Sequence, residues 1–444
     1  MQTNKQLNLK DAILEHKALI SVIGLGYVGL PLAIAFFKAG FPVLGFDIDD
    51  KKVSDLNKGK SYILHIPSKE IETMVKGKRF TATSDFSRLK KPDVIIVCVP
   101  TPLDEHREPD MRYIVDTAEI ISKNLRKGQL IILESTSYPG TTDEVMLPIL
   151  EKSGLKASID FSLGFSPERE DPGNPNFTTT QIPKVVAGID PVSSELTISL
   201  YKQAFEKVVP VSSTRTAEAV KLTENIFRAV NIALVNELKM IYAQFGIDIW
   251  EVIETAKTKP FGFMPFYPGP GLGGHCIPID PFYLTWKARE YGFVTRFIEL
   301  AGEINTNMPD YVIDVLTRAL NEKRKSVKSS RILILGIAYK KNVADVRESP
   351  AFPIIQKLIS MGAIVDYYDP FVPVIGHMRK FQNIQGVKSI KWDAKTLAKY
   401  DASVIITDHS NVDYDFLVKH SKLVVDTRNA TKNVKENRER IKSA

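Results

Sequence analysis

The fold of this chain is decided by residues 19–29, which read Leu-Ile-Ser-Val-Ile-Gly-Leu-Gly-Tyr-Val-Gly. The apolar run before the first glycine predicts a short buried strand, and residues 30–38 predict an apolar helix that ends at Gly40. A second apolar strand over residues 42–46 is followed by Asp47. The order of strand, glycine-rich turn, helix and strand predicts a βαβ unit and therefore a parallel sheet.

The glycines of this unit have the spacing Gly-x-Gly-x-x-Gly, the pattern of a dinucleotide-binding turn. We expect Gly24 to make the tight turn, Gly26 to admit a pyrophosphate and Gly29 to let helix and strand pack closely. We expect Asp47 to accept hydrogen bonds from the adenosine ribose and to repel a 2′-phosphate, which favours NAD, although the lysines at 51–52 leave NADP open. The predicted cofactor contacts of the turn are Gly24, Leu25, Gly26, Tyr27, Val28 and Gly29.

The same alternation continues to about residue 210. Further apolar strands are predicted at 92–99, 129–133, 161–165 and 184–188. Pro100-Thr101 and Ser135-Thr136 follow two of these strands and should lie at the carboxyl end of the sheet, where doubly wound folds bind ligands. Cys98 lies within a β-branched run and is expected to be part of the core.

Beyond residue 210 the pattern changes from strand to helix. Residues 217–245 are apolar at helical spacing and contain no Gly or Pro, and a second helix is predicted at 293–321. Lys221 and Asn225 share one face of the first helix, a face that periodicity alone would place in solvent. We predict a central helical domain over 211–322, whose long helix joins two domains or forms a dimer surface.

Residues 323–330 read as a basic linker, after which a second αβ alternation begins. Its strands are predicted at 331–336, 363–368, 402–406 and 423–426. A single glycine, Gly336, stands where the first domain has three, so this domain is expected to hold something other than a second dinucleotide. Four basic residues near its strand ends would bind phosphate or face solvent: Lys340, Lys341, Arg347 and Arg428. The predicted fold is α/β, with two doubly wound Rossmann-like domains, 1–210 and 323–444, joined by a long central helix.

A second glycine-rich run, residues 269–274, precedes His275 and Cys276. In such a run the backbone can approach a ligand closely. Helix is predicted from about residue 282, so Cys276 should lie beside a helix N-terminus, whose partial positive charge favours the thiolate. Asp280 would share its face if the helix begins earlier. The residues predict a nucleophile at Cys276, and the alternative is a small apolar side chain in a tight turn.

The composition excludes several classes of function. The chain has 444 residues, 44% of them hydrophobic, and its net charge of +7 comes from bases and acids mixed throughout, which argues against a nucleic-acid surface. No apolar run is long enough to insert in a membrane, and no secretory signal is read. Two cysteines and seven histidines without a ligand-like cluster predict no metal and a cytoplasmic location. The basic tail, 432–442, is expected to be a solvated or frayed end.

One type of reaction would use an NAD-binding turn, a second nucleotide-type domain and a thiolate together. A cysteine can capture an aldehyde as a thiohemiacetal, which gives up a hydride to become a thioester, and water then releases an acid. One site would thus take a primary alcohol to a carboxylate and reduce two cofactors.

Several motifs in this order resemble those of the nucleotide-sugar 6-dehydrogenases, the family that contains UDP-glucose dehydrogenase, along almost the whole chain. They are GLGYVGLP at 24–31, CVPTP at 98–102, ST at 135–136, SPE at 166–168, AEAVK at 217–221 with Asn225, GGHC at 273–276 and DVRESP at 345–350. The run at 269–284 is most similar to the branch that acts on UDP-N-acetylglucosamine. The resemblance implies a homodimer or larger homo-oligomer that oxidises the C6 alcohol of this UDP-sugar, for surface polysaccharide such as lipopolysaccharide O-antigen.

The resemblance also implies catalytic roles for residues of the long helix and the cysteine motif. Cys276 would be the nucleophile that forms the thiohemiacetal and the thioester. Lys221 would stabilise the oxyanion with the help of Asn225. Asp280 would hold Lys221 or the water involved in proton transfer.

The remaining implied roles lie at strand ends. Glu168 would serve in thioester hydrolysis, and Thr136 would place a water or the cofactor. Further cofactor contacts would be Asp47, Pro100, Thr101, Ser135, Thr136 and Arg347. The UDP-sugar contacts would be Glu168, Lys184, Lys221, Asn225, Gly273, Lys340 and Arg428.

Two positions depart from the UDP-glucose branch. That branch often has a second Glu four residues after the one at Glu168, where this chain has Pro172. It also often has a Lys before the Asp of the cysteine motif, where this chain has Ile279. Both argue against UDP-glucose, and UDP-N-acetylmannosamine is a rival substrate. Outside the family, a β-hydroxyacid-type dehydrogenase would need no thiol, and a non-catalytic regulator would bind NAD without turnover.

Overall fold

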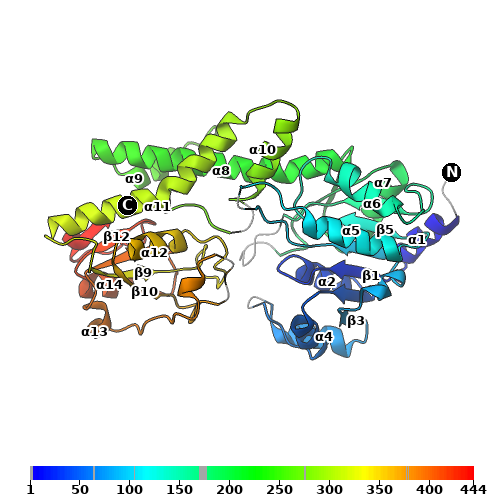
Figure 1. Cartoon of the computed structure of the whole chain (residues 1–444), viewed down its shortest axis with the longest axis horizontal. Coiled ribbons are helices and arrows are strands. Elements are labelled where there is room, and N and C mark those ends of the chain that lie inside the picture. The colour runs from blue at the N-terminus through cyan, green and yellow to red at the C-terminus, as the bar shows by residue number, and fades with distance from the viewer. Residues whose placement is uncertain are drawn as a thin grey trace. The chain divides into compact units, whose positions relative to one another are not determined.

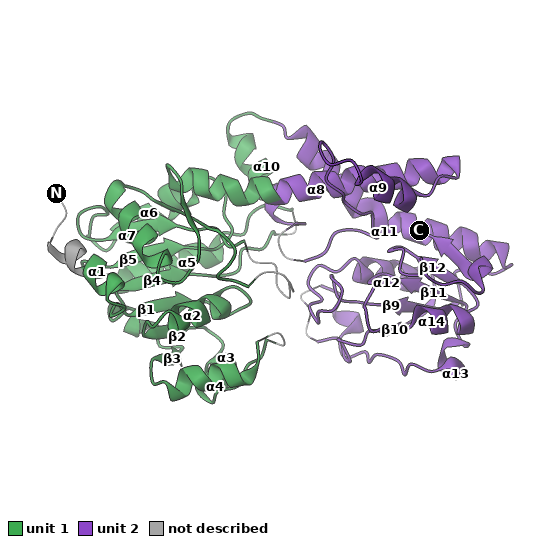
Figure 2. Cartoon of the chain, turned by 180° about the vertical axis from the view of Figure 1, so that it is seen from behind, with its two compact units in different colours: residues 1–224, 282–293 green, residues 225–281, 294–444 purple. Residues whose placement is uncertain are grey.

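The computed structural model describes residues 4–63, 66–104, 106–169, 178–274, 277–376, 378 and 380–444. The chain forms two compact units (Figure 2). Unit 1 comprises Met1–Glu224 and Phe282–Phe293, and unit 2 comprises Asn225–Pro281 and Val294–Ala444. Strands and helices alternate within each unit (Figure 1). The three-domain division expected from the sequence stays a prediction.

Among the described residues, the sheet of unit 1 has eight strands in the order β3-β2-β1-β4-β5-β6-β7-β8. They are β1 Ile20–Ile23, β2 Val43–Phe46, β3 Phe80–Thr83, β4 Val94–Val97, β5 Leu130–Leu133, β6 Ser162–Phe165, β7 Lys184–Gly188 and β8 Val208–Pro210. Neighbours run parallel, apart from β6 and β7, which are antiparallel. The first six follow the order 3-2-1-4-5-6 of dinucleotide-binding sheets. This confirms the first predicted Rossmann-like domain.

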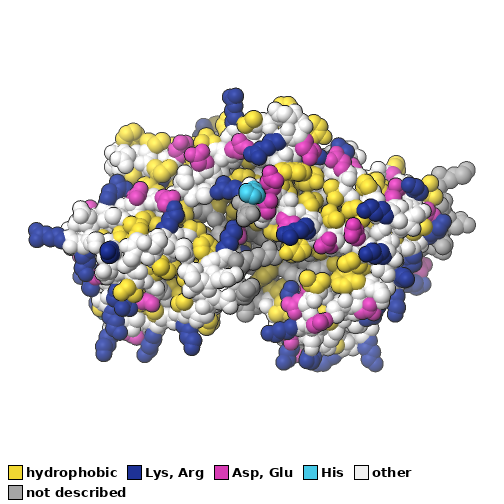
Figure 3. Space-filling model, in the orientation of Figure 1, with side chains coloured by type: hydrophobic (Ala, Val, Ile, Leu, Met, Phe, Trp, Pro, Cys, Tyr) yellow, Lys and Arg dark blue, Asp and Glu magenta, His cyan; other side chains and the backbone are white. Residues whose placement is uncertain are grey.

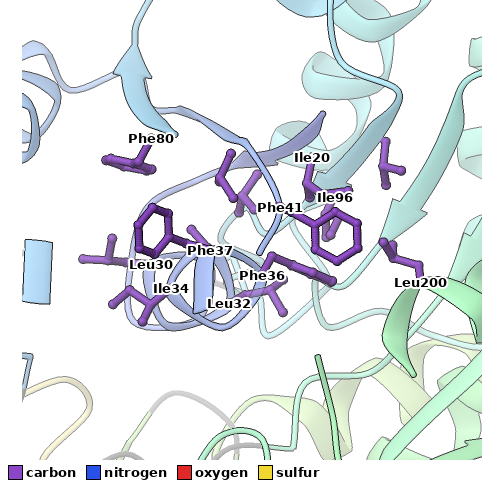
Figure 4. Packing of buried hydrophobic residues seen from close by; sticks show 14 of the residues in the cluster. Ile20, Leu30, Leu32, Ile34, Phe36, Phe37, Phe41, Phe80, Ile96 and Leu200 are labelled. Atoms are coloured by element: carbon purple, nitrogen blue, oxygen red, sulfur yellow. The ribbon is translucent and has the colours of Figure 1, made fainter. Parts of the chain in front are cut away.

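The helices of unit 1 cover this sheet. They are α1 Asn4–Leu14, α2 Gly29–Lys38, α3 Asp50–Asn57, α4 Ser68–Lys76, α5 Arg112–Asn124, α6 Leu147–Glu151 and α7 Pro191–Tyr201. Helix α2 is buried from Gly29 to Phe37, which explains why its sequence is apolar on all sides. Phe36 meets Phe41 edge-on, with ring centroids 5.9 Å apart, beside Ile96 and Leu200 (Figure 4). This packing anchors α2, and hence the glycine-rich turn before it, on the sheet.

Unit 2 contains a five-stranded parallel sheet among the described residues, in the order β10-β9-β11-β12-β13. The strands are β9 Arg331–Leu335, β10 Ile364–Tyr368, β11 Ala402–Ile405, β12 Val424–Asp426 and β13 Ile441–Ser443, and the helices include α12 Ala351–Ser360, α13 Ala394–Leu397 and α14 Tyr414–His420. The order corresponds to 2-1-3-4-5, the second common arrangement of doubly wound sheets. The second Rossmann-like domain is therefore confirmed as well.

The tail of the chain differs from the sequence-based expectation. Residues 432–442 were expected to be solvated or frayed; most of their side chains are indeed exposed or half-buried, but the frayed alternative is wrong. Strand β13 pairs in parallel with β12, and Ala444 is buried after it. Val434 also enters the core. The lysines and arginines of the tail hid an edge strand, because a short edge strand needs few apolar residues to stay paired.

The helical segment predicted between the two sheets is present. It consists of α8 Thr214–Phe245, α9 Ile249–Ala256, α10 Asp280–Glu290 and α11 Arg296–Glu322. Helix α8 has 32 residues and confirms the long central helix. Helix α10 begins at Asp280, two residues before the predicted start, so Asp280 lies in its first turn. None of the helices described is long and apolar enough to cross a membrane.

Candidate active site

The three glycines of the glycine-rich turn of unit 1 differ in the space around them: a side chain would clash with the backbone at two of them but not at the third. Gly24 has a φ of +89°, and a Cβ there would lie on the carbonyl oxygen of Cys98. A Cβ at Gly29 would lie on the carbonyl oxygen of Gly24. At Gly26, by contrast, no described atom lies within 4 Å of where a Cβ would be. The space over Gly26 is therefore available to a ligand at the N-terminus of α2.

Asp47 follows β2 and closes this turn. Its carboxylate accepts hydrogen bonds from the backbone N–H of Leu25 at 3.0 Å and of Asp49 at 3.0 Å, and Lys52 Nζ lies 3.6 Å from it. Tyr62 donates its hydroxyl to the carbonyl of Leu25. The open glycine, the helix N-terminus and an acid beside the turn fit the pyrophosphate and ribose of NAD.

The segments after β4 and β5 are tied together at the carboxyl end of the sheet. The Ser135 hydroxyl accepts the backbone N–H of Val99 at 2.9 Å, and Thr101 is buried while Pro100 is exposed. Cys98 lies just beyond the end of β4 and is half-buried, and it packs against the core as expected. Burial raises the pKa of its thiol, and the nearby Glu134 adds to this.

Residues of α8 reach the same edge of the sheet. Lys221 Nζ donates to Thr136 Oγ1 at 2.7 Å, and both residues are buried. Glu218, also buried, accepts the backbone N–H groups of Gly140 at 2.6 Å and Thr142 at 2.9 Å. These partners show that the solvent-facing alternative for this face of α8 is wrong, because the loop after β5 covers it.

A second buried pair lies in unit 2. Asn225 Nδ2 donates to Asp280 Oδ2 at 2.5 Å, and Arg228 Nη2 donates to the side-chain oxygen Oδ1 of Asn225. Both Asn225 and Asp280 are buried. His275 and Cys276 lie outside the described residues, so the position of the predicted nucleophile is not described. The pair nevertheless shows that the first turn of α10 and helix α8 are joined through predicted catalytic side chains.

The glycine-rich run at 269–274 is filled by the protein itself. A Cβ at Gly269 would meet the guanidinium of Arg428. A Cβ at Gly273 would lie 2.7 Å from Tyr339 Cβ, and one at Gly274 would lie 2.9 Å from the Tyr339 ring. On the side where a Cβ would lie, these glycines pack closely against unit 2's own side chains, and their approach to a ligand stays a prediction.

The basic residues predicted to bind nucleotide in unit 2 have partners within it. Arg347 forms a fork on Asp345, with Nη2 2.6 Å from Oδ2 and Nε 3.0 Å from Oδ1, and its carbonyl accepts the N–H of Gly274 at 3.1 Å. Arg428 Nε donates to the carbonyl of Ile406 at 3.0 Å. Lys340 is half-buried. Their roles toward cofactor and substrate stay predictions.

Lys184 and Glu168 also meet, together with a residue that the sequence analysis did not select. Lys184 Nζ lies 2.8 Å from Glu134 Oε2 and 3.2 Å from Glu168 Oε2. Lys184 was predicted to contact substrate, but its ammonium is buried between two carboxylates. Glu134 directly follows the apolar strand β5, and that place at the carboxyl end of the sheet was the signal that could have identified it.

Comparison with known proteins agrees with this arrangement. The NAD binding domain of the UDP-glucose/GDP-mannose dehydrogenase family matches residues 18–205, its central domain matches 215–307 and its UDP binding domain matches 333–433. The chain belongs to this family. It is therefore an oxidoreductase that uses NAD, which confirms the predicted cofactor. Family membership also decides against the β-hydroxyacid-type dehydrogenase and the non-catalytic regulator.

Individual relatives of this dehydrogenase are similar over nearly their whole length. A UDP-N-acetyl-D-glucosamine 6-dehydrogenase of Pseudomonas aeruginosa is 38% identical over 393 residues, covering 88% of this chain and 90% of the relative. A UDP-N-acetyl-D-mannosamine dehydrogenase of Pyrococcus horikoshii is 34% identical over 424 residues, covering 93% and 96%. A solved structure of the UDP-D-ManNAc dehydrogenase from that organism superimposes with a TM-score of 0.84 at 32% identity, covering 94% and 96% of the two chains.

The surface of the dehydrogenase carries mixed charges. On the face drawn in Figure 3, acidic side chains lie among the basic ones. The described residues contain no group of three or more His, Cys, Asp or Glu placed to hold a metal ion.

Proposed function

We propose that this dehydrogenase oxidises the C6 alcohol of UDP-N-acetylglucosamine to the carboxylate, giving UDP-N-acetylglucosaminuronic acid for surface polysaccharide. The observation that carries the proposal is the 38% identity, over 88% of the chain, with the P. aeruginosa UDP-N-acetyl-D-glucosamine 6-dehydrogenase. UDP-N-acetylmannosamine is the second candidate, because dehydrogenases of that sugar nucleotide are 34% and 35% identical. UDP-glucose is a third.

The glycine-rich turn from Gly24 to Gly29 would hold NAD, which would supply the hydride acceptor for both oxidations. Cys276 adds to the C6 aldehyde as a thiohemiacetal, whose oxidation leaves a thioester. Water then attacks the thioester, so that the cysteine leaves as a thiolate and the acid is released. Over the whole reaction the alcohol loses two hydrides to two NAD, water supplies the second carboxylate oxygen, and the remaining protons pass to solvent.

The contacts of the described side chains support specific roles for them in these reaction steps. Lys221, held by Thr136 at 2.7 Å, offers a buried cation to the oxyanion that forms when Cys276 adds to the aldehyde. Asn225 and Asp280, joined at 2.5 Å, orient the first turn of α10 beside the cysteine motif. Glu168 acts on the water that hydrolyses the thioester.

The stoichiometry of NADH tests the reaction. Purified enzyme is given limiting UDP-N-acetylglucosamine and excess NAD, and NADH is counted per sugar consumed. Two NADH support the four-electron oxidation, whereas one NADH would mean an aldehyde or ketone product and no role for a thioester. Turnover of UDP-N-acetylmannosamine or UDP-glucose alone would assign the enzyme to that substrate instead.

The cysteine is tested by Cys276→Ser. A hydroxyl is far less ionised than a thiol at neutral pH, so acid formation should stop. NAD affinity should stay within about twofold of wild type, since the thiol is not part of the cofactor turn. Normal acid formation by this variant would contradict the thioester.

An apolar stripe on α8 supports a homodimer as the working form. Phe227, Leu234, Ile241 and Phe245 recur at helical spacing and are 48%, 49%, 41% and 67% exposed. Leu234→Glu should therefore yield monomers in size-exclusion chromatography with light scattering, whereas Lys127→Glu, on an exposed side chain, should not. Two cysteines in the whole chain support a reducing, cytoplasmic location.

A further inference from the structure

Three charged side chains converge in the interior of unit 1. Glu134 is 0% exposed, Lys184 is 4% exposed and Glu168 is 11% exposed at the side chain. The ammonium of Lys184 bridges the two carboxylates, at 2.8 Å from Glu134 and 3.2 Å from Glu168. Even when buried charges are paired, their attraction often does not recover the cost of removing them from water, so stability alone does not account for this arrangement.

The sheet topology brings the three residues together. Glu134 directly follows β5, at the carboxyl end of the parallel strands. Strand β7 runs antiparallel to β6, with Phe165 opposite Ala187, so its first residue lies at that same end. Continuing this register past the ladder places Glu168 opposite Lys184. A parallel β7 would have put Lys184 at the far end of the sheet.

Aromatic side chains lie next to Lys184 and Glu134. Tyr201 of α7 is buried and donates its hydroxyl to Glu134. Lys184 Nζ lies 5.6 Å from the centre of the Tyr201 ring and 5.4 Å from that of Phe205. Arg169, the neighbour of Glu168, is paired with Glu224.

The charges act on one another in definite directions. Burial lowers the pKa of Lys184, but Glu134 and Glu168 raise it by more, so the ammonium stays charged. Burial raises the pKa of Glu134, and Lys184 only partly offsets this. Among the described residues, the Cys98 thiol after β4 and the Tyr201 hydroxyl of α7 face the cluster from other elements, and Lys221 of α8 acts on the Cys98 thiol.

We propose that Glu134 and Lys184 are positioning residues for Glu168. Lys184 orients the Glu168 carboxylate and keeps it ionised. Glu134 offsets part of the positive charge of Lys184, so that Glu168 remains basic enough to accept a proton from water. The inference rests on the proposed function, in which Glu168 serves thioester hydrolysis. Lys184 is thereby assigned to support the carboxylate rather than to contact the sugar.

Removing the positive charge of Lys184 and removing the negative charge of Glu134 should shift the pH dependence of thioester hydrolysis in opposite directions. Acid formation is followed by rapid quench in a single turnover across pH 5 to 9. Lys184→Met removes the cation beside two carboxylates, and the midpoint of the acidic limb should rise by about 1 pH unit or more. Glu134→Gln leaves the lysine charge to Glu168 alone, and the midpoint should fall by about 0.5 pH unit or more.

Further variants distinguish a positioning role from a general loss of structure. Lys184→Arg keeps the charge, and its midpoint should lie closer to wild type than that of Lys184→Met. The surface pair Lys156 and Glu151, 3.1 Å apart, supplies the control, since Lys156→Met and Glu151→Gln should leave the profile unchanged. If Lys184→Met does not fold, the test is the fall of the midpoint in Glu134→Gln, which should persist in the double variant with Lys184→Arg because that variant keeps the positive charge.

The failures are distinguishable. If wild type releases acid but the profiles of the Glu134 and Lys184 variants superimpose on it, the positioning role is wrong and the proposed function stands. If Glu168→Gln releases acid at the wild-type rate, the role of Glu168 is wrong, and the inference falls with it. If wild type releases no acid from any UDP-sugar, the proposed function itself is wrong.

Discussion

The turn after β1 in unit 1 and the turn after β9 in unit 2 begin in the same way. Gly24 has a φ of +89° and Gly336 has a φ of +76°, both in the left-handed region. Each lies against the backbone of the neighbouring strand segment, so that a Cβ would overlap the carbonyl of Cys98 or approach the carbonyl of Thr407 to 2.6 Å. The first glycine of each turn is therefore required by the fold and not by a ligand.

In each unit an aspartate follows the next strand and closes the turn, but the two aspartates differ in their hydrogen bonds. Asp47 accepts the N–H of Leu25, and Lys52 lies near its carboxylate. Asp369 is bonded far more heavily. Its donors are the backbone N–H groups of Ile337, Ala338, Phe371 and Val372 and the ring Nε2 of the buried His409.

The second positions of the two turns complete the contrast. Gly26 is open on the side where a Cβ would lie, whereas its counterpart Ala338 is fully buried. Helix α2 begins at Gly29, but in unit 2 the next helix, α12, begins only at Ala351. One turn leaves open the space beside a helix N-terminus, and the other uses its polar groups to hold its own loop. This difference agrees with the match of the two parts of the chain to separate NAD binding and UDP binding domains of the family.

The largest effect should come from the shared glycine. Gly24→Ala and Gly336→Ala should each lower the free energy of unfolding by about 3 kcal/mol or more, because the methyl meets a backbone and φ is left-handed. The matched controls are Gly154→Ala and Gly386→Ala, which also have positive φ but no described atom within 4 Å of the new Cβ. These should cost only about 1 kcal/mol in urea unfolding. A similar cost in all four variants would mean that the close approach does not matter.

The two acids should respond unequally to the same substitution. Asp369→Asn should destabilise the protein by about 2 kcal/mol at pH 7, because an amide cannot accept all the hydrogen bonds that the carboxylate accepts. Asp47→Asn should cost less than half as much.

The cost at Asp369 should also depend on pH. Burial alone would raise the pKa of Asp369, but hydrogen bonds from His409 and the backbone lower it below its ordinary value. Its stabilising effect is therefore present above about pH 4 and is lost as pH falls through the folded-state value. The difference between wild type and Asp369→Asn in urea unfolding should shrink below pH 4, and a constant difference would contradict the charge-based explanation.

A substitution at Gly26 should change NAD affinity much more than it changes the free energy of unfolding. Gly26→Ala should weaken NAD binding about tenfold, or about 1.4 kcal/mol, because its methyl would enter the space over the turn. It should change the free energy of unfolding by only about 0.5 kcal/mol. Ala338→Gly, the counterpart in unit 2, should leave NAD affinity unchanged when both are titrated calorimetrically. Equal NAD affinities in Gly26→Ala and wild type would place the cofactor elsewhere.

The smallest effect concerns cofactor choice. Asp47→Ala removes the anion expected to repel a 2′-phosphate and releases Lys52, which lies 3.6 Å from that carboxylate. The ratio of kcat/KM for NADP to that for NAD should rise about fivefold, or about 1 kcal/mol. The double variant Asp47→Ala with Lys52→Met should lose part of this gain. An unchanged ratio in the single variant would mean that Asp47 does not contact the ribose.

Local patterns were enough to predict much of this dehydrogenase. The strand, turn and helix around Gly24, the long helix α8 and the second αβ alternation are all legible because each depends on the conformational preferences and apolar period of neighbouring residues. The pairing of Lys221 with Thr136 brings together two residues already selected as candidates. The order of motifs along the chain was likewise sufficient to identify the family.

Tertiary structure alone decided which charges meet and which surfaces are covered. Lys184 and Glu134 are 50 residues apart and meet because β7 runs antiparallel to β6. Whether the glycines at 269–274 face a ligand or a side chain depends on Tyr339 and Arg428, which come much later in the chain. The edge strand β13 has little apolar character of its own and is held by β12. Period and spacing are properties of neighbours in sequence, whereas burial and charge pairing depend on distant segments that only the folded chain brings together.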